Sequence, residues 1–138
     1  MCRKTLEPKI VIPKIEIDKK LMDEVKHQPD LEKQVIVHCS YSVNEFMLQY
    51  RIWPSTFLYD DHSTQKSNLI QAYGIELAPE WSYHIGYDPI RFTLIFSGLP
   101  KDVTAFSLLE EALGGRFPFY SKSIERNETD VYQVRLYA

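Results

Sequence analysis

Hydrophobic and polar residues alternate most regularly in residues 90–98, and this pattern predicts a β-strand. Four large apolar side chains fall on one side of the segment when it is extended: Ile90, Phe92, Leu94 and Phe96. Leu99-Pro100 ends the run, because proline has no N–H group to continue a ladder of hydrogen bonds. A strand that is so apolar on one face must be covered by a second layer. The segment therefore predicts a packed β-protein, and it predicts no chemistry.

Similar extended segments recur along the chain and predict further strands. They are separated by turn residues at spacings of about ten residues, and they lie at 35–41, 46–53, 56–59, 67–77, 83–87, 116–124 and 131–137. Residues 46–53 are expected to form a hairpin with residues 35–41. Residues 104–113 predict a short helix instead, which Gly114-Gly115 would end. Since helical patterns do not alternate with the strands, a parallel βαβ sheet is not expected.

These elements predict an all-β fold, namely an antiparallel β-sandwich of seven or eight strands with one short helix. A barrel is the second choice. Residues 1–32 differ from the rest, because Pro8 and Pro13 interrupt their short isoleucine-rich stretches. We therefore expect an N-terminal extension over residues 1–32 and a sandwich domain over residues 33–138.

Composition narrows the class of protein further. The formal net charge is −3, from 16 basic and 19 acidic residues, whereas nucleic-acid-binding modules concentrate Lys and Arg. No nucleic-acid partner is therefore expected. Residues 1–7 lack the apolar core of a signal peptide, and no run of 18 apolar residues could span a bilayer. Together with only two cysteines, Cys2 and Cys39, this predicts a soluble cytoplasmic protein that does not bind membranes.

Side chains capable of catalysis or metal binding are present but do not form a recognisable motif. His38 and Cys39 would point to opposite faces of a strand, and Cys39 is expected to be a buried free thiol. Asp60 and His62 are expected to lie in a solvated turn, and Glu110-Glu111 on the solvated face of the predicted helix. We predict no catalytic residue, no metal site and no cofactor. An enzyme that uses His62, Asp60 or His84 would need them to converge in a cleft.

Aromatic residues near strand ends are the best candidates for a binding surface. Trp53, Trp81, Tyr83 and Tyr87, together with Arg51, could contact a sugar, a small ligand or a partner protein. The alternative interpretation is that each tryptophan plugs one end of the core. Both interpretations remain open at this point.

Several motifs resemble those of a known family. They are Arg51-Ile-Trp-Pro-Ser-Thr-Phe-Leu, Gly74-Ile-Glu-Leu-Ala-Pro-Glu-Trp, Phe92-Thr-Leu-Ile-Phe-Ser-Gly-Leu-Pro-Lys and Phe106-Ser-Leu-Leu-Glu. Over residues 35–137 the chain resembles an uncharacterised family of small immunoglobulin-like β-sandwich proteins, found mainly in Bacteroidetes-type bacteria. It departs from the usual Phe-Asp-Leu pattern at Ser107. The resemblance implies an immunoglobulin-like fold and a bacterial source, and it implies no established activity.

The sequence thus predicts a non-catalytic binding or interaction module. Its expected partner is another protein, or a second copy of the chain bound through an exposed sheet edge. Carbohydrate or small-ligand binding through the aromatic residues is the first alternative. A hydrolase-type enzyme is the second.

Overall fold

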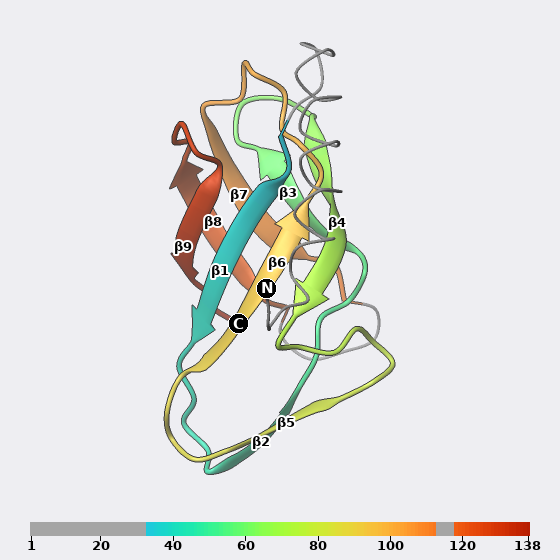
Figure 1. The fold of residues 1–138 in the computed structure, drawn as a ribbon, viewed down its shortest axis with the longest axis vertical. Coiled ribbons are helices and arrows are strands. Elements are labelled where there is room, and N and C mark those ends of the chain that lie inside the picture. Colours follow the sequence, from blue (N-terminus) through green and yellow to red (C-terminus); the bar gives the residue numbers. More distant parts are fainter. Residues whose placement is uncertain (1–32, 113–117) are drawn as a thin grey trace, which may run out of the picture. The chain divides into compact units, whose positions relative to one another are not determined.

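The computed structural model describes residues 33–112 and 118–138, which form nine strands and no helix (Figure 1). The strands are β1 (Val35–Tyr41), β2 (Met47–Tyr50), β3 (Thr56–Asp60), β4 (Lys66–Tyr73), β5 (Ser82–Ile85), β6 (Ile90–Phe96), β7 (Ala105–Glu110), β8 (Tyr120–Glu125) and β9 (Val131–Arg135). The prediction of an all-β fold is confirmed. The extension predicted for residues 1–32, Cys2 and the predicted Gly114-Gly115 helix end lie outside the described residues.

The predicted helix over residues 104–113 is wrong, because β7 occupies most of this segment. Phe106, Leu108 and Glu110 alternate with less buried residues and all point to the interior. The strand pairs with β3 on one side and with β8 on the other. Two ladders of hydrogen bonds and a buried face outweigh the weak local preference for a helix.

Seven strands form one mixed sheet, in the order β8-β7-β3-β4-β6-β1-β9 (Figure 1). All neighbours are antiparallel except β1 and β9, which are parallel. The prediction of a purely antiparallel arrangement is therefore wrong. The β1–β6 register places Val37 opposite Leu94 and Cys39 opposite Phe92, so the two most regular alternating segments supply one continuous apolar wall.

The core lies inside the curved sheet. Among the described residues, twelve large apolar side chains are fully buried: Phe96, Phe106, Ile52, Leu58, Ile90, Leu94, Leu99, Leu108, Leu136, Val35, Val37 and Val103. Burying one large apolar side chain contributes about 1.5–3 kcal/mol. Burial of the inward side chains is thus the main contribution to the stability of the sheet. The outward side chains and the loops are not constrained by the core in this way.

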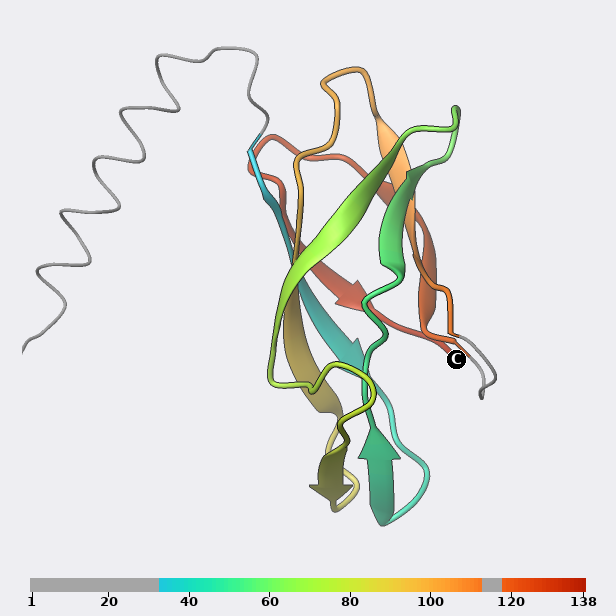
Figure 2. The same cartoon turned by 90° about the vertical axis from the view of Figure 1, so that its right-hand side faces the viewer.

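A second, two-stranded sheet consists of β2 and β5 and lies at one end of the molecule (Figure 2). The expected hairpin between residues 35–41 and 46–53 is not formed, because β1 already pairs with β6 and with β9. The two segments that connect β2 and β5 to the main sheet pair with each other at the bridge between Ile52 and Leu77. We refer to residues 46–50 and 82–87 as the ribbon.

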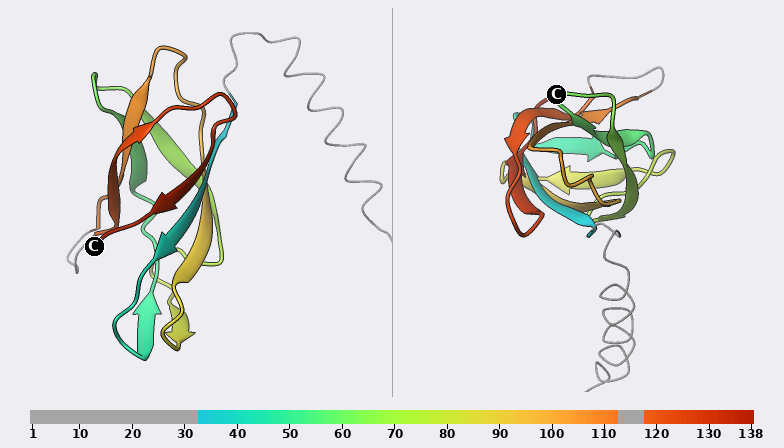
Figure 3. Two further views of the ribbon diagram at one scale, coloured as in Figure 1. Left: turned by 90° about the vertical axis from the view of Figure 1, so that its left-hand side faces the viewer. Right: turned by 90° about the horizontal axis from the view of Figure 1, so that it is seen from above.

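The main sheet curls until its two edge strands meet (Figure 3). They are joined at one point, where the N–H of Tyr120 donates to the carbonyl of Tyr137 at 2.8 Å and the reverse bond is 2.9 Å. The sheet is therefore nearly closed. The antiparallel immunoglobulin-like sandwich is not confirmed, because the seven strands belong to one sheet and not to two that face each other.

Candidate functional site

Arg51 brings together the two tryptophans that the sequence singled out. Its guanidinium carbon lies 3.9 Å from the ring centroid of Trp81 and 5.2 Å from that of Trp53. Its Nη1 donates to the carbonyl of Pro79 at 2.9 Å, which fixes the side chain between the two loops. A cation over an aromatic face is attracted by the negative centre of the ring. One face of Trp81 is therefore already occupied, and a sugar could stack only on the other.

Neither tryptophan belongs to the buried core. Trp81 is 40% exposed and Trp53 is half-buried. The interpretation of each tryptophan as a plug that closes the core is therefore not supported. The cluster lies at the junction between the main sheet and the ribbon, where it links the segment after β2 to the segment before β5.

The carboxylate of Glu110 accepts hydrogen bonds from two loops, one of which carries Trp53. Its Oε2 accepts the N–H of Trp53 and its Oε1 accepts the N–H of Phe119, both at 2.9 Å. Burial, the largest influence, raises the pKa of Glu110, although these two donors and the charge of Arg51 act in the opposite direction. Glu110 had been expected on a solvated helix face, and this prediction is wrong. Its function is structural, because both carboxylate oxygens satisfy backbone groups of the two loops.

Tyr83 and Tyr87 do not join the arginine–tryptophan cluster but lie on the ribbon. Tyr83 stands opposite Gln49, and Met47 stands opposite Ile85, so these four side chains share one face. Three of them are strongly exposed: Met47 69%, Tyr83 70% and Ile85 68%.

At the end of the ribbon, Tyr87 packs against Phe46 with ring centroids 5.6 Å apart. These two rings are 67% and 52% exposed. Together with Met47, Tyr83 and Ile85 they are the five large, strongly exposed apolar side chains of the ribbon, and we call this group the ribbon surface. Its five members are all more exposed than Trp81.

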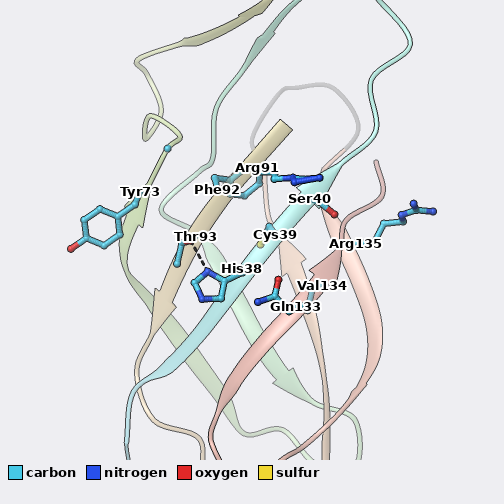
Figure 4. Close-up of a pocket in the computed structure, with 11 residues that line it drawn as sticks. His38, Cys39, Ser40, Tyr73, Arg91, Phe92, Thr93, Gln133, Val134 and Arg135 are labelled. Carbon is cyan, nitrogen blue, oxygen red and sulfur yellow. Dashed lines mark hydrogen bonds between the residues drawn. The ribbon is translucent and has the colours of Figure 1, made fainter. Parts of the chain in front are cut away.

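A hollow of about 750 Å³ lies on the outer face of β1, β6 and β9 (Figure 4). Strand register places Ser40 between Arg91 and Arg135. In the next row His38 Nδ1 lies 2.9 Å from Thr93 Oγ1. No carboxylate lines the hollow. Its outward face is therefore polar and basic.

Cys39 is buried and unpaired, as the sequence predicted. Burial raises the pKa of its thiol to about 12. The thiolate is the reactive form of cysteine. Cys39 therefore serves as a small apolar member of the core.

The acid–base candidates do not converge. Asp60 accepts hydrogen bonds from Ser63 Oγ at 2.5 Å and from the N–H of His62 at 3.0 Å, and these bonds lower its pKa. The turn that joins β3 to β4 lies here, as predicted. Asp60 itself is the last residue of β3 and is buried, so its prediction as a solvated side chain is wrong. His84 lies on the ribbon, at the opposite end of the molecule from this turn (Figure 2), where its Nε2 contacts the carbonyl of Asp88 at 2.8 Å.

Comparison of the chain with protein-family models, with curated proteins and with solved structures gives no match. Within residues 33–112 and 118–138, no group of three or more His, Cys, Asp or Glu side chains is placed to hold a metal ion. The same residues contain no helix with the length and apolar character needed to cross a bilayer.

Proposed function

We propose that this chain is a non-catalytic interaction module that self-associates through the ribbon surface. The observation that carries the proposal is the exposure of five large apolar side chains on a two-stranded ribbon: Phe46, Met47, Tyr83, Ile85 and Tyr87. Single exposed apolar residues are common, whereas a contiguous group of them is typical of an interaction site. The other side of β2 packs against the core through Leu48 and Tyr50, so a second copy would cover the face of the ribbon that faces away from the core.

A second copy of the same ribbon is the occupant that we propose. The face that carries Met47, Gln49, Tyr83 and Ile85 has no charged side chain, so two copies can stack without repulsion between like charges. With exposures of 52–70%, five side chains of this size offer about 600 Å² per copy. Complete coverage of these side chains in both copies would bury about 1,200 Å², which is the lower limit of specific, stable interfaces.

The arginine–tryptophan cluster supports a sugar-binding function less well, because Arg51 covers one face of Trp81. We also propose that the chain belongs to the uncharacterised family of small immunoglobulin-like proteins that it resembles in sequence. It is compatible with a binding module that lacks an activity of its own.

Light scattering coupled to size-exclusion chromatography tests the proposal. The wild-type chain is expected to be a dimer at micromolar concentration, and Tyr83→Ser/Ile85→Ser is expected to be a monomer. Ile70→Ser is the matched control, because Ile70 is 47% exposed but lies on β4. This variant is expected to remain a dimer. A wild-type chain that is monomeric up to millimolar concentration contradicts the proposal, and so does a dimer that the ribbon substitutions leave intact.

A further inference from the structure

The two edge strands of the main sheet enclose an open seam. The turn at residues 126–130 joins β8 directly to β9, yet the two strands meet only at Tyr120 and Tyr137. Within the described residues, no backbone hydrogen bond joins residues 121–125 to residues 131–135. A hollow of about 490 Å³ is lined by residues of both strands. The turn closes one end of this hairpin and the Tyr120–Tyr137 bridge closes the other. Between these two points β8 and β9 are not hydrogen-bonded to each other, and we call this gap the seam.

Backbone donors and acceptors of β9 face the seam. The N–H of Leu136 donates to Ser40 on β1, whereas the N–H of Tyr137 donates to Tyr120 on β8. Because backbone groups alternate in direction along a strand, Gln133 and Arg135 direct their N–H and C=O groups into the seam. Within the described residues β9 pairs only with β1 in the sheet, so these groups are the ones to which an added strand would bond.

The pattern of charge disfavours closure of the hairpin. Counting two residues along each strand from the Tyr120–Tyr137 bridge places Lys122 opposite Arg135. Both side chains are exposed, and none of the described residues that line the hollow is a carboxylate. Like charges directly opposite each other on neighbouring strands are destabilising. Ser123, with a φ of 58°, lies at an irregularity in the β7–β8 ladder and further disturbs the edge of β8.

We propose that the seam binds an extended acidic segment of a partner protein, which pairs with β9 as an added strand. Its backbone would bond to Gln133 and Arg135. An outward Asp or Glu of the segment would lie between Lys122 and Arg135, where it neutralises both charges. Its inward side chains would be small and apolar, because they face Ser121 and Val134, which are buried. Charge complementarity identifies this occupant, since the seam is basic in a chain whose net charge is −3.

The site is independent of the ribbon surface, which shares no residue with the hollow. The competing explanation is that exposed cations and a bulge only protect a free edge from pairing with other strands. The two explanations differ in one respect. Edge protection requires that no strand binds, whereas the proposal requires that an acidic strand binds and a basic one does not.

Fluorescence anisotropy with labelled heptapeptides tests the proposal on the full chain. The probe alternates glutamate with valine, one control replaces glutamate by lysine, and a second control carries N-methyl groups that block strand pairing. Only the glutamate peptide is expected to bind. In ¹H–¹⁵N spectra, this peptide is expected to shift the amide signals of Gln133 and Arg135.

Charge substitutions then locate the site. Lys122→Glu and Arg135→Glu are each expected to weaken binding of the glutamate peptide at least about fivefold, which corresponds to loss of one exposed ion pair at the upper end of its usual range. The double variant is expected to bind the lysine peptide instead. Lys66→Glu is the matched control, because Lys66 is an exposed cation on β4, and it is expected to change affinity less than twofold.

Three results would overturn the proposal. If neither peptide binds, the seam is a protected edge only. If the N-methylated peptide binds as well as the probe, the interaction does not involve strand pairing. If Lys66→Glu weakens binding as much as Arg135→Glu, the attraction is diffuse and the seam is not its site. Tyr83→Ser/Ile85→Ser, which tests self-association, is expected to keep full affinity for the glutamate peptide. Failure of the self-association proposal can therefore be distinguished from failure of the strand-binding proposal.

Discussion

Arg126 is the side chain on which we base the most detailed stability prediction. It forms a bidentate pair with Asp130, from Nε to Oδ1 at 2.9 Å and from Nη2 to Oδ2 at 3.0 Å. The guanidinium also donates to three carbonyl groups of the β6–β7 connection: Leu99 at 3.2 Å, Pro100 at 2.6 Å and Val103 at 3.2 Å. One side chain therefore ties the β8–β9 turn to a second loop.

The expected loss in the free energy of unfolding depends on which interactions remain after the substitution Arg126→Met. Methionine keeps most of the apolar stem, but Asp130, which is 5% exposed, loses its charge partner. Removing one member of a buried ion pair costs about 3–5 kcal/mol. Because the side chain of Arg126 is still 16% exposed, we expect a loss near the lower limit, about 3 kcal/mol. That is a large fraction of the total stability of a domain of this size.

The loss should depend on pH. Burial acts to raise the pKa of Asp130, but hydrogen bonds from Arg126 and Tyr132 and the charge of Arg126 together lower it. A carboxyl group with a lowered folded-state pKa stabilises the fold above its unfolded pKa of about 3.9, and this contribution disappears as the pH falls through the lower folded value. Without Arg126, burial dominates and the pKa of Asp130 rises. The stability difference between wild type and variant should therefore shrink towards about pH 3.

Urea unfolding followed by circular dichroism measures this difference at neutral and at acidic pH. Arg126→Met/Asp130→Asn should lose less stability than Arg126→Met alone, since no charge is left unpaired. Arg135→Met is the control, because Arg135 is exposed on β9, and it should cost less than about 0.5 kcal/mol. A loss below about 1 kcal/mol for Arg126→Met, the value typical of a surface pair, or a loss that does not change with pH, would refute the reasoning.

Three further predictions concern single side chains. Glu110→Ala should lower the free energy of unfolding by about 2 kcal/mol, because the N–H groups of Trp53 and Phe119 lose their acceptors. Since the folded-state pKa of Glu110 is raised, wild-type stability should fall relative to Glu110→Gln as the pH rises above about 4.3, which pH-dependent urea titrations detect. In a Cys2→Ser chain, Cys39 should react with a thiol-specific dye only after unfolding, because its pKa of about 12 leaves almost no thiolate. Arg51→Ala should increase acrylamide quenching of tryptophan fluorescence by uncovering one face of Trp81, and unchanged quenching would contradict the cation–π contact.

Local alternation predicted some strands almost to the residue. Residues 35–41 coincide with β1, and residues 90–98 contain β6 with only the last two residues outside the strand. Both segments place an apolar side chain at every second position, and that periodicity is encoded within the segment itself. Pairing partners are not encoded in this way. β2 pairs with β5 and not with β1, because long-range contacts elsewhere already occupy both edges of β1.

The candidate site could be predicted only where neighbouring residues define it. Arg51 and Trp53 are near each other in sequence, whereas the sequence left open whether Trp81 is exposed or plugs one end of the core. The role of Glu110 could not be predicted, because its two partners come from loops that are distant in sequence. No local pattern indicates that a carboxylate will be buried between two such loops.

The open seam follows from the same long-range pairing that the sequence did not reveal. β9 lies parallel to β1, so the sheet must close between β8 and β9, although these two strands are consecutive and joined by a short turn. A hairpin of this kind would ordinarily pair along its whole length. Here complete pairing would bring Lys122 against Arg135. Lys122 and Arg135, which complete pairing would bring opposite each other, are therefore the same two groups that an acidic strand would need in order to bind there.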